Sequence, residues 1–377
     1  MLEGLDAVNW AALGQGDVPD LLRALRSPDP AAGEKGREAL FGTLVHQGTR
    51  YAATAAAVPF LAELAVAPDT PERHWLVVLL TYAAIGYDQA SLPAGIIEGS
   101  LDELARTTNT PGDEQHYGPW ALAAYQAVEA TVPSLLPLLD HDDVRLRRAV
   151  AHLVAWFPRW APASLPRLRA RLAAEPDPDA KATMAVALGL LAGAQAQTDD
   201  APRLNELLVD GDAVVRWGAA VALVRLFPQA PPEPAIRELL GWLTSEAAPE
   251  RDPEILFCEP QDYALLVVRG DPDLRERAAE AILDRLPALP GAAAYSPVWD
   301  LVELAFEADH PQLEVAFAEL APLQQRVLRA LVDMPALWRA EGDRIPPVFP
   351  LFSYWGSFEV PRTLEELREQ LWAYTGA

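Results

Sequence analysis

A short motif, in which an apolar or small residue precedes a proline and a leucine-rich stretch follows, recurs along the N-terminal half of this chain. It reads Val-Pro-Asp-Leu-Leu at residues 18–22 and Val-Pro-Ser-Leu-Leu at residues 132–136. The prolines of the motif, including a degenerate copy at residue 93, are Pro19, Pro59, Pro93, Pro133, Pro166 and Pro202. The steps between them are 40, 34, 40, 33 and 36 residues. A period of this size is typical of stacked arrays, in which each unit buries its apolar face against its neighbours.

Aspartates and basic residues repeat with a similar period. The aspartates are Asp29, Asp69, Asp143, Asp177 and Asp212, and the basic residues are Arg37, Arg73, Arg145, Lys181 and Arg216. An aspartate in a turn can accept hydrogen bonds from the free amide groups that open the following helix. A proline within a helix removes one backbone hydrogen bond and kinks the helix. We therefore expect a unit of one proline-kinked helix, an aspartate-bearing turn, and a second helix opened by a basic residue.

An arginine that occurs once in each unit can bridge carboxylates or carbonyl groups of adjacent units. We expect such a ladder on an internal ridge of the stack. Its predicted members are Asp143, Arg145, Lys181, Asp212 and Arg216.

Proline, aspartate and arginine in this order resemble the HEAT repeat family, and the resemblance extends over residues 18–230. Residues 46–59 are also similar to a stretch found in bacterial HEAT-like proteins of unassigned role. The chain departs from the family pattern where Lys181 replaces arginine and where Asn109 stands at the expected basic position. The resemblance implies an all-α fold, a right-handed α-solenoid (superhelix) of about eight HEAT-like helix pairs.

Four regions follow from these patterns. Residues 1–17 are expected to cap the array, residues 18–230 to form regular repeats, and residues 231–344 to form degenerate repeats. Residues 345–377 combine an aromatic, proline-rich segment with a last amphipathic helix, and we expect them to be an ordered cap or an interaction segment. A polar loop over residues 107–119 interrupts the third unit.

The composition limits which partners and which cellular compartment we expect for this chain. The formal net charge is −24, which argues against a phosphate-binding surface and permits a basic protein partner. The single cysteine, Cys258, excludes internal disulfides and a cysteine-rich metal site. No secretory signal is visible, and the most apolar helix, residues 184–194, is too short to span a bilayer. We expect a cytoplasmic protein without membrane association.

No catalytic motif is present, and we expect no catalytic residue, cofactor or metal. Two histidine–tryptophan pairs stand 36 residues apart, His116 with Trp120 and His152 with Trp156. Residues four apart on a helix share a face, so the pairs could align as a ligand site, or they could simply pack. Trp217 follows a repeat arginine directly and could anchor a partner or belong to the core.

The leading interpretation is a non-enzymatic scaffold or adaptor that binds a basic protein or peptide in a concave groove lined by the second helices. The alternative is a ligand-binding or catalytic HEAT-like protein, since the family includes DNA glycosylases, bilin lyases and a di-iron hydroxylase. The hydroxylase requires His-Glu dipeptides, which this chain lacks. A glycosylase needs a basic face, for which one arginine cluster is available: Arg145, Arg147, Arg148, Arg159, Arg167, Arg169 and Arg171. We expect no duplex DNA binding; the oligomeric state stays open.

Overall fold

The computed structural model describes residues 2–27, 29–86, 119–243, 260–269, 271–289, 291–306, 316–339, 346–348 and 364–376. In these residues every regular element is an α-helix or a 3₁₀ helix, and no strand is present. The prediction of an all-α fold is confirmed. The chain divides into two compact units, and the division falls between Ala235 and Ile236, within α12. We call the two units the N-terminal unit and the C-terminal unit.

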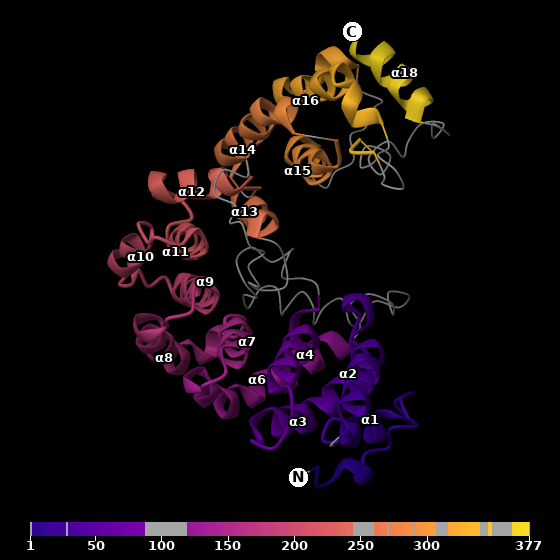
Figure 1. Ribbon diagram of the computed structural model, residues 1–377, viewed down its shortest axis with the longest axis vertical. Helices are drawn as coiled ribbons and strands as arrows, with labels where there is room; N and C mark the ends of the chain where they lie inside the picture. Colours follow the sequence, from indigo (N-terminus) through magenta and orange to yellow (C-terminus); the bar gives the residue numbers. More distant parts are fainter. Residues whose placement is uncertain are drawn as a thin grey trace. The chain divides into compact units, whose positions relative to one another are not determined.

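The N-terminal unit contains the helices that the sequence motif predicts (Figure 1). Their bounds are α1 Val18–Ala24, α2 Pro30–Leu44, α3 Ala52–Val66, α4 Arg73–Ile85, α6 Pro119–Leu135, α7 Val144–Val154, α8 Ala161–Ala174, α9 Pro178–Ala194, α10 Ala201–Leu207 and α11 Ala213–Leu226, with α12 Glu233–Leu243 crossing the division. Short 3₁₀ helices precede or follow them at Leu5–Ala7, His46–Gly48, Leu136–Asp140 and Pro158–Trp160.

Helix packing in the N-terminal unit follows the chain order. Within a pair, α1 packs on α2, α3 on α4, α8 on α9, and α10 on α11. The second helices also pack in succession, α4 on α7, α7 on α9, and α9 on α11. Each helix pair therefore buries its apolar side chains against the next pair, as the repeat period predicts.

The repeat prolines occupy two kinds of position. Pro59, Pro133 and Pro166 lie inside α3, α6 and α8, as predicted. Pro19 and Pro202 instead lie in the first turn of α1 and α10, where no backbone hydrogen bond is lost. The expectation of an internal proline is thus wrong for those two helices. The degenerate copy at residue 93 lies outside the described residues.

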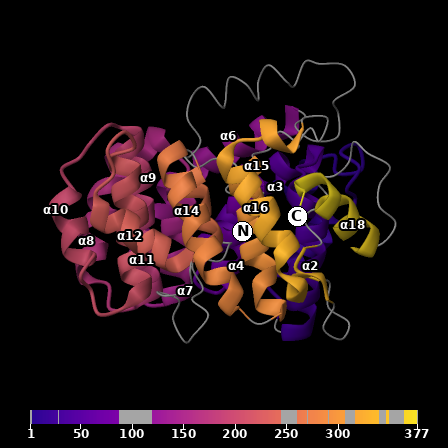
Figure 2. The same ribbon diagram turned by 90° about the horizontal axis from the view of Figure 1, so that it is seen from above.

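Helices α9 and α11, which lie side by side in Figures 1 and 2, approach each other closely. A Cβ atom added to Gly189 of α9 would lie 2.4 Å from the Cα of Ala222, and one added to Gly218 of α11 would lie 2.7 Å from the oxygen of Ala182. Only glycine permits backbones to approach this closely. Between residues 180 and 192, every residue of α9 except Lys181 is buried, so the core surrounds this helix on nearly all sides.

The C-terminal unit is also helical, with α13 Pro260–Arg269, α14 Pro272–Arg285, α15 Tyr295–Phe306, α16 Pro322–Asp333 and α18 Leu364–Thr375. Short 3₁₀ helices lie at Leu286–Ala288, Gly291–Ala294, Phe317–Glu319 and Pro335–Trp338. Consecutive helices pack again, α13 on α14, α14 on α15, α15 on α16, and α16 on α18. Of the predicted aromatic segment, only residues 346–348 are described, and they are buried.

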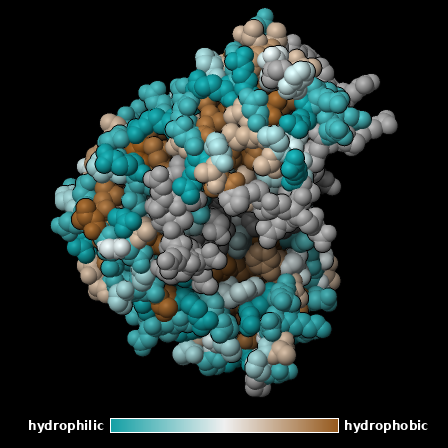
Figure 3. All heavy atoms as spheres, turned by 45° about the horizontal axis from the view of Figure 1, so that its top comes forward, coloured by the Kyte–Doolittle hydropathy of each residue, from teal (hydrophilic) through white to brown (hydrophobic). Residues whose placement is uncertain are grey.

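On the face shown in Figure 3, hydrophilic residues cover most of the described surface, and hydrophobic residues show in smaller separate areas. Among the described residues, the exposed large hydrophobic side chains are Val66, Trp120, Val209 and Trp372. The segment Trp120–Asp140 is long and apolar enough to cross a membrane by length and composition, but half of it is buried inside the structure. Its helix α6 packs against α3 and α4, and a buried core helix passes the same test.

Candidate functional site

The turns that open α7, α9 and α11 in the N-terminal unit share one arrangement. Asp143, Asp177 and Asp212 are the N-cap residues of these helices. Each side chain accepts a hydrogen bond of 2.9 Å from a backbone amide in the first turn. The predicted capping role of these aspartates is therefore present in the structure, and it satisfies amide groups that a helix start leaves free.

A second acceptor stands two residues before each of these caps. The side chains of His141, Glu175 and Asp210 accept hydrogen bonds from the backbone amides of Asp143, Asp177 and Asp212 at 3.0, 3.1 and 2.9 Å. Ser27 does the same for Asp29 at 3.1 Å. In each of these turns, the side chain two residues before the cap therefore holds the cap residue in place.

A basic residue stands four positions after each cap, at Arg147, Lys181 and Arg216. Arg147 Nη1 donates to the backbone oxygens of His141 and Asp142 at 2.7 and 2.8 Å. Arg216 Nη1 donates to the equivalent oxygens of Asp210 and Gly211 at 3.0 and 3.4 Å. The same backbone geometry in two units shows that position four after the cap is the repeated basic position.

These basic side chains also join one unit to the next. Arg147 makes a bidentate pair with Glu175, with both nitrogen–oxygen distances at 2.8 Å, and Lys181 lies 4.0 Å from Asp210. In the preceding unit, Arg73 contacts His141 Nε2. Arg147 and Lys181 each contact the carboxylate that holds the following cap, and Arg73 contacts the ring of the equivalent residue, His141. We call the three contacts, Arg73–His141, Arg147–Glu175 and Lys181–Asp210, the inter-repeat ladder.

Arg147–Glu175 is the buried member of the ladder, with side chains 7% and 0% exposed. Burial opposes the charge of Glu175, but hydrogen bonds from Arg147 and Arg171 outweigh it and lower the pKa of the carboxyl group. The bond from Glu175 correspondingly raises the pKa of Arg147. Both groups are therefore charged at neutral pH inside the unit.

The expected ladder residue Arg145 is not part of this buried pair. Its side chain is 47% exposed and pairs with Glu72 and Asp143 at 3.3 and 3.4 Å. The expectation of a buried, internal Arg145 is wrong because the 36-residue step from Arg145 to Lys181 compares position two after one cap with position four after another. Arg147 occupies the equivalent position. Asp143, Lys181, Asp212 and Arg216 are half-buried.

The side chains considered for a ligand site lie mostly in the core. His152 is 3% exposed, and Trp156 and Trp217 are fully buried, so a partner cannot reach them in this structure. The rings of His152 and Trp156 lie edge to face at 5.9 Å. Burial lowers the pKa of His152 to about 3, which keeps its imidazole neutral. These positions fit the packing alternative.

Only one member of the first pair belongs to the described residues. Trp120 is 38% exposed at the start of α6, and His116 lies outside the described residues. Among the described residues, no group of three or more histidine, cysteine, aspartate or glutamate side chains could hold a metal ion.

The arginine cluster considered for DNA contact is internally paired. Seven arginines form ion pairs with seven carboxylates of the same unit. The pairs are Arg145 with Glu72 and Asp143, Arg147 and Arg171 with Glu175, Arg148 with Asp179, Arg159 with Glu129, Arg167 with Asp140, and Arg169 with Asp200. The cluster therefore presents no excess of positive charge to a phosphate backbone.

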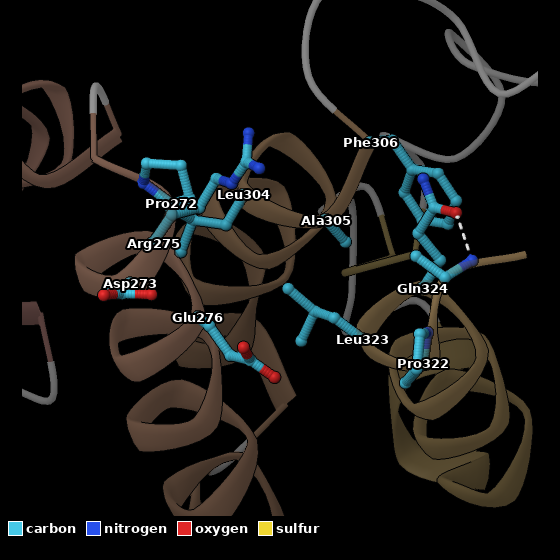
Figure 4. Close-up of a pocket in the computed structure, with 11 residues that line it drawn as sticks. Pro272, Asp273, Arg275, Glu276, Leu304, Ala305, Phe306, Pro322, Leu323 and Gln324 are labelled. Atoms are coloured by element: carbon cyan, nitrogen blue, oxygen red, sulfur yellow. Dashed lines mark hydrogen bonds between the residues drawn. The ribbon is translucent and has the colours of Figure 1, made fainter.

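The C-terminal unit contains a pocket of about 440 Å³ between the start of α14, the end of α15 and the start of α16 (Figure 4). Leu304 and Phe306 are buried in its wall, and Leu323 is half-buried. The polar side chains around it are Asp273, Arg275, Glu276 and Gln324. Gln324 accepts a hydrogen bond of 3.0 Å from the backbone amide of Ala321, which fixes one edge. No sequence pattern indicates this pocket, because it lies between three helices.

Comparisons with known proteins assign no family. No protein-family model and no curated protein matches this chain. Among solved structures, the chain is similar to the crystal structure of an engineered protein from the Northeast Structural Genomics Consortium, at 15% sequence identity and a TM-score of 0.33. That match covers 96% of this chain and 100% of the other. It is too distant to carry an argument about function.

Proposed function

We propose that this protein is a HEAT-like repeat scaffold, cytoplasmic and non-enzymatic, that binds a basic protein or peptide. The proposed architecture is a right-handed α-solenoid of about eight helix pairs. Two features of the N-terminal unit support it: the second helices pack in succession, and the inter-repeat ladder repeats one contact from unit to unit.

The observation that carries the choice of partner is the pairing of the arginine cluster. Its seven arginines are compensated by carboxylates of the same unit, while the whole chain has a formal net charge of −24. The field that such a surface produces attracts cations and repels nucleic acid. Charge complementarity then supplies a fast association rate and selectivity for basic partners.

The buried positions of Trp156 and Trp217 change where contact is expected. Because both side chains are fully buried, the contact surface cannot consist of these two tryptophans. We propose instead that a partner of the N-terminal unit approaches the exposed polar residues at the helix starts, of which Glu72 and Asp142 are examples.

Affinity capture from the source cells, followed by titration of the purified partner, tests the proposal. We expect a partner of net positive charge whose Kd weakens at least tenfold between 50 and 300 mM salt, because exposed charges are screened by salt. A 20-base-pair DNA duplex should not bind in an anisotropy titration at 150 mM salt. A neutral or acidic partner whose Kd is independent of salt would contradict the proposed charge recognition, and micromolar duplex binding would favour the glycosylase-like alternative.

A further inference from the structure

The first contact of the inter-repeat ladder differs chemically from the two that follow it. In the later contacts the acceptor is a carboxylate, that of Glu175 or Asp210. A carboxylate has two acceptor oxygens, so it can serve the amide of the cap and a basic side chain of the preceding unit together. In the first contact the same position is His141, an imidazole. We call this contact, with the adjoining starts of α4 and α7, the α4–α7 joint; the two helices lie side by side in Figures 1 and 2.

His141 cannot serve both partners as the carboxylates do. A neutral imidazole has one acceptor nitrogen, and its other nitrogen carries a hydrogen. Nδ1 of His141 accepts a hydrogen bond of 3.0 Å from the amide of Asp143, which assigns the hydrogen to Nε2. Nε2 faces Arg73 Nη2, which is also a donor. The contact of His141 with Arg73 therefore lacks the hydrogen bonding that joins Arg147 to Glu175 in the next contact.

A second histidine, His74, lies on the α4 side of the joint. It is half-buried in the first turn of α4, and among the described residues its Nδ1 has no hydrogen-bond partner. Burial lowers the pKa of His74, and the charge of Arg145 lowers it further. Glu72 and Asp143 act in the opposite direction, and Arg148 adds to the lowering. A positive charge on His74 would also meet the positive end of the α4 dipole.

Charged groups of both signs lie near the two histidines. They come from the start of α4, the turn before α7, α7 and α8, and they are Glu72, Arg73, Asp140, Asp142, Asp143, Arg145, Arg147, Arg148 and Arg167. Arg147 and Arg148 also pair with Glu175 and Asp179 of the next unit. Carboxylates and guanidinium groups ordinarily keep their charge between pH 5 and 8, whereas histidine changes its charge in that range. The two histidines are therefore the groups through which pH acts on this joint.

We propose that the α4–α7 joint is a proton-sensitive hinge of the N-terminal unit, closed while His74 and His141 are neutral and open when they bind protons. A protonated His141 donates from both ring nitrogens, so the amide of Asp143 loses its acceptor. The imidazolium then also faces the guanidinium of Arg73. Both changes oppose closure of the joint.

The neighbouring contacts of the unit do not respond in this way. The contacts of Arg147 with Glu175 and of Lys181 with Asp210 involve no histidine. The pKa of Glu175 is lowered despite burial because Arg147 donates to it, so this pair stays charged as the pH falls to 5. The packing of α3 on α6, on the first-helix side, stays in place as the axis of the hinge.

Hydrogen exchange measured by mass spectrometry tests the hinge in the full-length protein. Exchange is compared at pH 7.5 and 5.5, after correction for the intrinsic effect of pH on amide exchange. Local opening removes protection from the helical turns that border the joint. We expect residues 76–79 of α4 and 147–150 of α7 to lose protection at least fivefold at pH 5.5. Residues 181–184 of α9 and 216–219 of α11 should change less than twofold.

Variants of the histidines assign the effect. His141→Asp introduces the carboxylate that Asp210 provides in a later unit, and it should reduce the acid response of α7 to less than twofold. His74→Gln removes the second titrating ring and should reduce the response of α4 at least twofold. The matched control, His46→Gln, removes an exposed histidine of the same unit and should leave both responses unchanged. His152 is present in all of these proteins, so its own acid effect is common to them.

Circular dichroism at pH 7.5 verifies that every variant is folded. If His141→Asp fails to fold, His141→Asn replaces it, because the amide oxygen of asparagine can accept from the cap amide and does not titrate.

Two results would overturn the proposal. The three contacts of the ladder could lose protection equally at pH 5.5, which would indicate unfolding of the whole unit. The acid response of α4 and α7 could also remain unchanged in both histidine variants. No partner takes part in this experiment, so its failure would leave the proposed function standing.

Discussion

The α7–α11 region of the N-terminal unit and the α14–α16 region of the C-terminal unit begin from the same helix motif but differ in what surrounds it. Asp271 caps α14 as Asp143 caps α7, and Arg275 stands four residues after that cap. Around α9, however, glycine contacts and the buried Arg147–Glu175 pair fill the space between helices. Around α14 the ion pairs that involve Arg326 are exposed, and a pocket remains. The α7–α11 region thus combines close backbone contacts with a buried ion pair, whereas the α14–α16 region combines exposed ion pairs with a pocket.

The largest expected effect comes from breaking the buried pair of the ladder. Glu175→Leu should lower the free energy of unfolding by about 3–5 kcal/mol, because it leaves Arg147 charged and buried without its carboxylate. The double substitution Arg147→Met with Glu175→Leu should recover part of that loss. Arg326→Met in the C-terminal unit, where the ion pairs are exposed, should cost less than about 1 kcal/mol. Urea unfolding checks all four proteins, and equal costs in the two units would contradict the comparison.

The close approach of α9 and α11 predicts a second large effect. Gly189→Leu should destabilise by about 3 kcal/mol, since its Cβ would overlap the backbone of Ala222 and the helices would have to separate. Gly42→Leu in α2 is the matched control, because no atom lies within 4 Å of its added Cβ. That control should be neutral or slightly stabilising, as leucine favours helix more than glycine does. Thermal melts of both variants distinguish a tight contact from a loss of glycine alone.

Acidic pH should destabilise the N-terminal unit, because His152 binds a proton more readily in the unfolded state. Its pKa is lowered from about 6.5 in an unfolded chain to about 3 by burial, so the unfolded state binds the proton more readily. The contribution of His152 to the free energy of unfolding is therefore fully present above pH 6.5. It decreases as the pH falls toward 3, with a loss of about 2 kcal/mol by pH 5. In His152→Phe this part of the pH dependence should disappear when unfolding free energies are measured from pH 5 to 7.5. An unchanged pH slope would place the titrating group elsewhere.

The smallest expected effect on stability is that of removing the Arg145 side chain, which is compared with removal of the nearby Arg147 side chain. Arg145→Ala should cost less than about 1 kcal/mol because its pairs with Glu72 and Asp143 are exposed. Arg147→Ala, two residues later, should cost about 3 kcal/mol or more. If the two variants have equal stability in urea unfolding, the assignment of Arg147 to the repeated basic position is wrong.

Part of this arrangement could be predicted from sequence alone. Local chemistry sets the helix starts, so the capping roles of Asp143, Asp177 and Asp212 were predictable. The basic position was missed at Arg147 because the repeat was counted from one arginine to the next rather than from each cap. Counting from the caps would also have aligned His141, Glu175 and Asp210.

Other features were beyond reach of a single sequence. The burial of Trp217 depends on which faces of α11 the neighbouring units cover, and a residue pattern does not specify this for a helix that is apolar on nearly all sides. The pocket depends on the spacing of three helices in the C-terminal unit, which no local signal encodes.

The inter-repeat ladder has a consequence for how such a chain can change its length. Each unit between α7 and α11 carries an acceptor for the unit before it and a basic residue for the unit after it. Duplication of one whole unit, by a genetic insertion of about 34 codons, would therefore supply both members of a new contact at the junction. An insertion of half a unit would leave one charged side chain without its partner in the adjacent unit. Evolution by whole-unit steps is thus the low-cost route to longer arrays of this protein.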